Sequence, residues 1–378
     1  MADANPRRRR GNSPLPLPDQ VALVLQGGGA LGAYQAGVYE ALAETDIEID
    51  WIAGISIGAV NAAIIAGNAP GERVAKLRSF WERVTATLPS LPMMGGDEWR
   101  EWMHILSAGF VAGTGVPGFF RPRAIPPILA QAGSEGALSF YDSAPLAGTL
   151  DAHVDWDRLN DGPMRLSVGA VNVESGNFHY FDTRDERLDA RHIMASGALP
   201  PGLPPIEIDG CWWWDGGIVS NTPLSHVLDR QSEDMLVFQV DLFPAKGDMP
   251  HTLMDVYARE KDIRYSSRTR QVTDQLMRLR KERETIRKVL KKLPEALKDD
   301  PDVAKLRALA AERAVNVVHL IYRAHGWEGG ARDFEFSRGS MEHHWAEGCA
   351  AIAETMKKGA LLTRNIIDGK TAAFDLAK

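Results

Sequence analysis

The chain is organised around residues 50–60, Asp50-Trp51-Ile52-Ala53-Gly54-Ile55-Ser56-Ile57-Gly58-Ala59-Val60. The first half is short and apolar, as in a buried strand, and residues 59–66 have the pattern of a helix. Between them lies Gly-x-Ser-x-Gly, in which Gly54 and Gly58 flank Ser56. A sharp turn from strand to helix with a serine at its apex is a nucleophile elbow, and its tightness excludes larger flanking side chains. The pattern predicts a nucleophilic Ser56; an ordinary serine in a strand-to-helix turn is the alternative.

A second glycine-rich turn comes earlier, where an apolar run at 21–25 leads into Gln26-Gly27-Gly28-Gly29-Ala30-Leu31-Gly32 and then a helical pattern. Glycines at a helix N-terminus expose backbone N–H groups that bind anions. One candidate ligand is the oxyanion that forms when Ser56 attacks an acyl group. The other is a dinucleotide, because Gly27-x-Gly29-x-x-Gly32 matches the dinucleotide fingerprint and Asp50 lies near the distance expected for a ribose-binding acid. The oxyanion is favoured, because a dinucleotide site does not explain the serine turn after the next strand.

Composition and charge describe an ordinary folded chain without a nucleic-acid-binding signature. The 378 residues include 44% hydrophobic and 25% charged residues, and the net charge is −7. Cys211 and Cys349 lie far apart without metal-ligand spacing, so neither a disulfide nor a metal site is predicted, and a reducing, cytoplasmic location is expected. No apolar run is long enough to cross a membrane. Residues 1–19, with Arg7–Arg10 before a proline-rich stretch, are predicted to be a disordered tail rather than a signal peptide, and contact with an anionic membrane is the lesser alternative.

The chain divides by composition near residue 244. Residues 20–243 alternate apolar strand segments with helical segments, which predicts an α/β sheet covered by helices on both faces. Residues 244–378 are predicted to form a mainly helical C-terminal extension, with one helical pattern at 303–320. Within it, residues 264–292 carry 11 basic and 3 acidic side chains and a narrow apolar seam. This helix is expected to pack on its own protein or on a partner helix, as in a homo-oligomer, with docking on an anionic membrane as the alternative.

Two aromatic segments each allow two interpretations. At residues 88–127, tryptophan, methionine and phenylalanine occur among glycines and prolines. Core packing around loops is the more common meaning, and a mobile apolar lid over a lipid site is the alternative. The three tryptophans at 212–214 are expected to pack on both faces of a strand, with a wall of an acyl-binding site as the alternative.

A third motif, Asp215-Gly216-Gly217, follows these tryptophans directly. A serine needs a base within hydrogen-bond reach, and an aspartate held in a glycine turn can come close and stay partly desolvated, which raises its basicity. A dyad of Ser56 and Asp215 is therefore favoured over a triad. A triad needs a histidine late in the chain, and the candidates by order are His226, His319, His343 and His344.

Taken in order, the glycine loop, the Gly-x-Ser-x-Gly turn and the Asp-Gly-Gly turn resemble the patatin-like phospholipase family. So do Ala195-Ser196-Gly197-Ala198-Leu199-Pro200-Pro201 and Ile218-Val219-Ser220-Asn221-Thr222-Pro223-Leu224, and the likeness covers about residues 20–243. The chain departs from many members at Ala30 and Leu31, where a Lys or Arg is common, so no phosphate contact is expected there. The C-terminal segment is similar to an uncharacterised extension found in a bacterial subset of the family.

The resemblance implies a three-layer α/β/α fold and a serine–aspartate dyad without a histidine. Carried onto this chain, Ser56 is the nucleophile and Asp215 is the base. The oxyanion hole would consist of the backbone amides of Gly27, Gly28 and Gly29. The glycines that support the three motifs are Gly32, Gly54, Gly58, Gly216 and Gly217.

The expected function is hydrolysis of a lipid acyl ester, or another acyl ester, through an acyl-enzyme and without a metal or cofactor. The protein is expected in the cytoplasm, at the periphery of a membrane, and no nucleic-acid partner is expected. Two hypotheses from other classes stay open. One is a nucleotide-binding module that uses the glycine loop, and the other is a non-catalytic scaffold that binds a membrane or a partner through residues 264–292.

Overall fold

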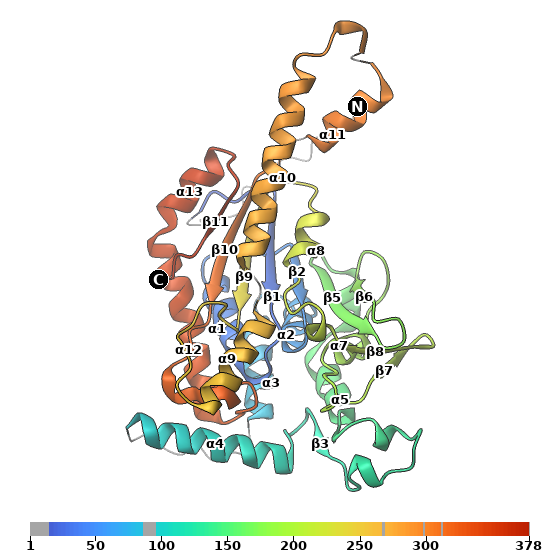
Figure 1. The fold of residues 1–378 in the computed structure, drawn as a ribbon, viewed down its shortest axis with the longest axis vertical. Coiled ribbons are helices and arrows are strands. Elements are labelled where there is room, and N and C mark those ends of the chain that lie inside the picture. The colour runs from blue at the N-terminus through green and yellow to red at the C-terminus, as the bar shows by residue number, and fades with distance from the viewer. Residues whose placement is uncertain (1–14, 86–95, 267–268, 298, 311–312, 378) are drawn as a thin grey trace.

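The computed structural model describes residues 15–85, 96–266, 269–297, 299–310 and 313–377. The strands of the main sheet are β1 (Gln20–Leu25), β2 (Trp51–Gly54), β5 (Arg165–Asn172), β6 (Phe178–Asp182), β7 (Ile206–Ile208), β8 (Cys211–Asp215), β9 (Met235–Asp241), β10 (Val315–Ile321) and β11 (Ala372–Phe374). Their order is β11-β10-β9-β1-β2-β5-β8-β7, with β6 also paired to β5 (Figure 1). The run from β11 to β5 is parallel, whereas β6, β7 and β8 pair antiparallel.

Helices surround this sheet, and a short second sheet lies beside it (Figure 1). The helices are α1 (Gly32–Ala43), α2 (Ile57–Ala66), α3 (Arg73–Val84), α4 (Asp97–Thr114), α5 (Ala144–His153), α6 (Trp156–Asp161), α7 (Ala190–Ser196), α8 (Leu224–Asp229), α9 (Leu253–Tyr265), α10 (Thr269–Leu290), α11 (Pro301–Leu309), α12 (Arg338–Lys357) and α13 (Gly359–Ile367). The second sheet pairs β3 (Arg121–Pro122) with β4 (Tyr141–Asp142). The 3₁₀ helices include η2 (Pro127–Leu129) and η6 (Gly326–Ala331).

The central strands are mostly apolar and almost entirely buried, as expected of strands that helices cover on both sides. All six residues of β1 are buried. Successive side chains of a strand point to opposite faces. Val21, Leu23 and Leu25 accordingly join a large core with α1, α2 and α12, whereas Ala22 and Val24 join a smaller core with α8. The sheet therefore forms the middle layer of the three-layer α/β/α fold predicted from the resemblance.

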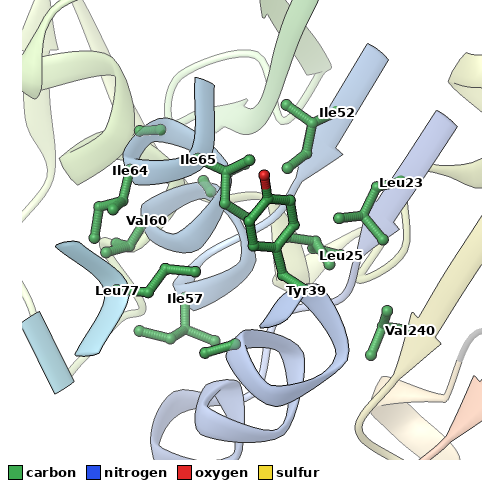
Figure 2. Close-up of a cluster of buried hydrophobic side chains, with 14 of the residues drawn as sticks. Leu23, Leu25, Tyr39, Ile52, Ile57, Val60, Ile64, Ile65, Leu77 and Val240 are labelled. Atoms are coloured by element: carbon green, nitrogen blue, oxygen red, sulfur yellow. The ribbon is translucent and has the colours of Figure 1, made fainter. Parts of the chain in front are cut away.

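The larger core fixes α2, and with it the start of that helix, against the sheet. Side chains from β1, β2 and β9 meet side chains from α1, α2 and α3 there (Figure 2). The labelled residues are Leu23, Leu25, Tyr39, Ile52, Ile57, Val60, Ile64, Ile65, Leu77 and Val240. Burying each aliphatic side chain of this kind contributes about 1.5–3 kcal/mol.

The described residues after position 244 contribute two strands to the main sheet in addition to their helices. β10 pairs in parallel with β9, with Val317 beside Val237, and β11 extends the sheet further. Helix α12 packs closely along α1, where a Cβ atom on Gly37 would lie 1.9 Å from the carbonyl oxygen of Trp345. The described part of residues 244–378 is mainly helical, and it also shares the sheet and the larger core with residues 20–243.

The helical pattern expected at 303–320 is wrong over its second half. α11 ends at Leu309, and residues 315–321 form β10. This segment, Val-Asn-Val-Val-His-Leu-Ile, is rich in β-branched residues, which are stiff about χ1 and suit a buried strand. Its apolar spacing alone did not distinguish a buried strand from a buried helix.

Two other expectations fall partly on residues outside the described ones. Of the predicted disordered tail, 1–19, residues 1–14 lie outside, and Leu15 is buried in the larger core. The predicted basic helix falls on the end of α9 and on α10. The side chains of residues 269–277, 279 and 280 lie outside the described ones, so its apolar seam stays a prediction. Among the described helices, none combines the length and hydropathy needed to cross a bilayer.

The contact between α1 and α12 makes a testable prediction. A Cβ atom on Gly348 would lie 2.1 Å from the carbonyl oxygen of Tyr34. We expect Gly348→Ala to lower the free energy of unfolding by about 1–3 kcal/mol, because the two backbones must move apart. Gly113→Ala is the matched control, since a methyl group there meets no atom within 4 Å. Urea unfolding measures both, and equal stability of the two variants would show that α12 is not part of the folding core.

Candidate active site

Ser56 lies in the predicted turn, between the end of β2 and the start of α2. Its backbone has φ 55° and ψ −123°, a conformation that non-glycine residues avoid. The flanking glycines are required by contact, because a Cβ atom on Gly54 would lie 2.4 Å from the carbonyl oxygen of Gly58. A Cβ atom on Gly58 would in turn lie 2.5 Å from the carbonyl oxygen of Leu25. The turn holds the Ser56 side chain at the N-terminus of α2, where backbone dipoles favour negative charge.

Asp215 is the last residue of β8 and lies beside the serine. The Ser56 side chain interacts with its carboxylate, and the Gly217 N–H donates a hydrogen bond to it over 2.7 Å. The carboxyl group is buried, and burial raises its pKa to about 7, although these two contacts act in the opposite direction. The sheet thus brings together the nucleophile and the base that the resemblance implied.

The three glycines after β1 lie beside the same serine, and their amides differ. The Gly27 N–H donates to the backbone carbonyl of Asn221 over 3.3 Å. Within the described part of the chain, the amides of Gly28 and Gly29 have no hydrogen-bond acceptor. Gly29 has φ 56°, and a Cβ atom on this residue would lie 2.2 Å from the backbone carbonyl oxygen of Asp333, so only glycine fits at this position. Of the three amides expected to form an oxyanion hole, two are therefore available.

These residues line one pocket of about 220 Å³. Its other walls are largely aromatic, and they include Phe119, Phe120, Phe243, Tyr265, Phe334 and Phe336. Phe119 and Phe120 come from the segment 88–127, and both also pack into the larger core, so this part of the segment serves as core and as pocket wall. Met93 and Met94 of that segment lie outside the described residues. An apolar chain fits a site of this kind, next to a nucleophile and a base.

A family model described as "Patatin-like phospholipase" matches residues 23–228, more than half of the chain. The chain belongs to the patatin-like phospholipase family. A second family model, described as "Patatin phospholipase", matches residues 263–365, which include α12 and β10.

Two relatives of this patatin-like protein are fungal lysophospholipases. Lysophospholipase nte1 of Aspergillus terreus is 57% identical over 239 residues, which cover 61% of this chain and 12% of that protein. Lysophospholipase nte1 of Aspergillus niger is 24% identical over 244 residues, which cover 62% of this chain and 12% of that protein. The chain therefore spans about an eighth of the length of these relatives.

Two solved structures align with most of this chain at low sequence identity. VipD from Legionella pneumophila is 15% identical with a TM-score of 0.36, and the alignment covers 94% of this chain and 78% of that one. Human GIVD cytosolic phospholipase A2 is 10% identical with a TM-score of 0.45, covering 94% of this chain and 61% of that one.

Two functional residues of this patatin-like site were missed by the sequence analysis. Ser196, at the end of α7, is completely buried; its hydroxyl accepts the Ser56 N–H over 3.0 Å and donates to the Gly169 carbonyl over 2.7 Å. It lies in a stretch that carried the resemblance, but nothing in its spacing assigned it a role. The Asn221 side chain, also without an assigned role, donates to the carbonyls of Gly27 and Tyr265 over 3.0 and 3.1 Å. Both hold backbone of the site in position.

The dinucleotide hypothesis does not fit the fold. Asp50 precedes β2, and its carboxylate accepts the Val21 N–H at the start of β1 over 2.8 Å. The glycine loop follows the opposite, C-terminal end of β1. An acid that binds the ribose of a dinucleotide lies at the same sheet edge as the glycine loop. Asp50 therefore cannot bind the ribose of a dinucleotide held at the glycine loop.

None of the four candidate triad histidines lines the pocket. His226 stacks on Tyr180 with 3.8 Å between ring centroids, and His344 lies 3.3 Å from the carboxylate of Glu328. The tryptophans at 212–214 do not line the pocket either, and Trp213 packs against Phe181. The packing interpretation therefore holds for Trp213, whereas Trp212 is exposed.

One group of described side chains has metal-ligand character, and it lies outside the pocket. Ligand atoms of His325, Glu328 and His343 come within 4.8 Å of one another. None of the three lines the pocket that contains Ser56. The chemistry available at Ser56 is therefore that of a hydroxyl, a buried carboxylate and backbone amides.

The raised pKa of Asp215 makes stability depend on pH in a direction that can be tested. In the unfolded chain this carboxyl loses its proton near pH 4, whereas burial in the folded protein retains the proton up to about pH 7. The folded state therefore binds the extra proton in this window, and the free energy of unfolding falls as pH rises, by about 1.4 kcal/mol for each pH unit. Asp215→Asn cannot ionise, so it should gain stability relative to the wild type between about pH 5 and about pH 8. Urea unfolding at both values measures this, and an unchanged difference would contradict the buried carboxylate.

Proposed function

We propose that this chain is a serine hydrolase that cleaves lipid acyl esters with Ser56 as nucleophile and Asp215 as base. The observation that carries the proposal is the position of Ser56 beside a buried carboxylate with a pKa near 7, in one pocket with the glycine loop. A base with a pKa close to the working pH is the most effective for removing the proton from a weak nucleophile. The membership of the patatin-like phospholipase family supports the same chemistry.

The reaction follows from the positions of these groups. Asp215 takes the proton of the Ser56 hydroxyl while the oxygen attacks the ester carbonyl. The negative charge that forms on the carbonyl oxygen is stabilised by the amides of Gly28 and Gly29 and by the N-terminus of α2. The proton on Asp215 passes to the leaving alcohol, which leaves an acyl-enzyme. Asp215 then takes a proton from water, the water attacks the acyl group, and the acid is released as Ser56 regains its proton.

A lipid acyl chain is the proposed occupant of the pocket. The aromatic side chains Phe119, Phe120, Phe243 and Phe336 surround the space next to Ser56. Removing a fatty chain from water against such walls is favourable by about 0.8 kcal/mol for each methylene group. Relatives of the chain are named lysophospholipases, which supports a lipid ester as substrate. A cytoplasmic location and a homo-oligomer through the C-terminal helices stay predictions.

The roles of Ser56 and Asp215 can be tested directly. A fluorophosphonate probe should label the wild type and leave Ser56→Ala unlabelled. Asp215→Asn should hydrolyse a soluble short-chain ester at least about 100-fold more slowly, because the general base is lost. His226→Ala and His344→Ala are the controls and should retain both labelling and hydrolysis. A folded histidine variant without activity would favour a triad, and probe labelling retained in Ser56→Ala would rule out this serine as the nucleophile.

The position of the serine turn should depend on Ser196. Removing its hydroxyl leaves the buried Ser56 N–H without an acceptor, which costs about 1–3 kcal/mol. We expect Ser196→Ala to lower kcat about 10- to 100-fold with little change in KM, because the pocket walls stay in place. Ser175→Ala, which removes an exposed hydroxyl bonded to Asn172, is the matched control. Steady-state kinetics on one soluble ester compares them, and an increase in KM alone would contradict a role at the nucleophile.

A further inference from the structure

Helix α4 exposes a continuous apolar stripe. Trp99, Trp102, Leu106 and Phe110 follow one another at steps of three and four residues, so they share one side of the helix. Their exposed fractions are 55%, 64%, 59% and 47%. Exposed apolar residues in a row of this kind are unusual in a soluble protein and mark a surface that binds something.

The opposite side of α4 is the side that packs on the protein. His104 lies against Trp327 with 4.9 Å between ring centroids, and Val111 is buried in the larger core. The Ser107 hydroxyl donates to the Glu335 carboxylate. The apolar stripe is therefore not an unfilled part of the core, because α4 already buries its other side.

A second exposed apolar surface lies next to α4 at the same end of the molecule (Figure 1). It belongs to the segment between β3 and β4, where Ile128, Leu129 and Phe140 are exposed to 91%, 74% and 56%. The two elements are joined, since the Tyr141 hydroxyl donates to the Ala112 carbonyl over 2.9 Å. The two exposed surfaces are therefore adjacent parts of one apolar region.

This region leads to the pocket. Tyr141 lines the pocket, and its N–H donates over 2.9 Å to the carbonyl of Gly202, another lining residue. Phe119 and Phe120 follow α4 within six residues and also line the pocket. Apolar side chains thus continue from the exposed surface of α4 to the space beside Ser56.

We propose that this end of the molecule, formed by α4 and residues 125–140, seats on the surface of a lipid bilayer. The inference rests on the proposed function, because a lipid acyl ester has to enter the pocket from a membrane. α4 would lie in the interface with its stripe among the acyl chains, and its two tryptophans suit the headgroup boundary. The bilayer supplies the substrate and covers the stripe in one step.

The distribution of charge favours a bilayer over a protein partner. From Trp102 to Phe120 the sequence contains no Lys, Arg, Asp or Glu. This uncharged stretch is suited to the acyl region, where each charged side chain costs several kcal/mol. Arg121, which pairs with Asp142 and has a side chain 69% exposed, ends the stretch where we place the lipid headgroups. Protein interfaces, in contrast, have a polar rim with hydrogen-bonding groups.

The experiment measures vesicle binding apart from catalysis. Co-sedimentation with vesicles of phosphatidylcholine alone, and of phosphatidylcholine with phosphatidylglycerol, is carried out in the full-length Ser56→Ala protein so that no lipid is consumed. We expect Trp102→Glu and Leu106→Glu to weaken binding at least about tenfold on both vesicles, since each places a charge in the acyl region. Leu361→Glu on α13 is the matched control, because Leu361 is 61% exposed and lies on a helix away from this end (Figure 1).

Each outcome decides the proposal. Trp102→Glu and Leu106→Glu in the active enzyme should hydrolyse a soluble short-chain ester at the wild-type rate, because neither residue lines the pocket. Unchanged vesicle binding in both variants, or binding that requires phosphatidylglycerol, would overturn the proposal that the apolar stripe of α4 inserts in the bilayer. A wild-type dimer that Leu106→Glu converts to a monomer would show that a second copy of the chain covers the stripe. If the proposed function is wrong, the wild type will not hydrolyse the ester, whether or not it binds the vesicles.

Discussion

The backbone of Ser56 is the constraint on which the site depends. Its φ of 55° is a conformation that costs a non-glycine residue about 1–3 kcal/mol, and such a conformation persists only where its surroundings hold it. β2 lies between β1 and β5 in the middle of the sheet, so the strand that carries the turn cannot shift. Ser196 holds the Ser56 amide and is itself tied to β5 through Gly169. The hydroxyl is thereby directed at Asp215 before a substrate binds, and this pre-organisation lowers the barrier to reaction.

The proposed base, Asp215, has a cost in stability. It is buried at the end of β8, and the same burial that raises its pKa makes its ionised form unfavourable in the folded protein. The contacts with Ser56 and with the Gly217 N–H offset only part of this cost. By contrast, Asp182 on β6 is surrounded by Arg165, Ser167 and His226, and these partners hold the pKa of its carboxyl well below its usual range despite burial. Both aspartates lie in the same sheet. Their different partners explain why Asp182 stays ionised as a structural anion, whereas the pKa of Asp215 is raised to near neutral pH, as the proposed base requires.

The C-terminal part of the chain holds the glycine loop in place. Gln26 donates from its side chain to the Tyr265 carbonyl over 2.8 Å and accepts the Phe243 N–H over 3.0 Å. On the other side of the loop, the Ala30 N–H donates to the Asp333 carbonyl over 2.9 Å. The loop is thus fixed between β9, α9 and the residues after η6, which also supply pocket walls. The C-terminal segment is therefore part of the site and of the sheet.

Residues close together in the sequence were sufficient to predict the serine turn and the Asp-Gly-Gly turn. Contacts between distant segments decided the burial, pKa and hydrogen bonding of their residues. The Gly54-Ile55-Ser56-Ile57-Gly58 turn was readable because sterics within a few residues allow little else, and Asp215 was readable because two glycines follow it. The strand at 315–321, the serine that supports the turn, and the choice of Gly28 and Gly29 over Gly27 were not readable. Each of these depends on a contact with a residue far away in the chain: β9 for the strand, Ser56 for Ser196, and Asn221 for the Gly27 amide. Turn geometry is dictated by neighbouring atoms, whereas burial, pKa and hydrogen-bond partners arise only when distant segments pack together.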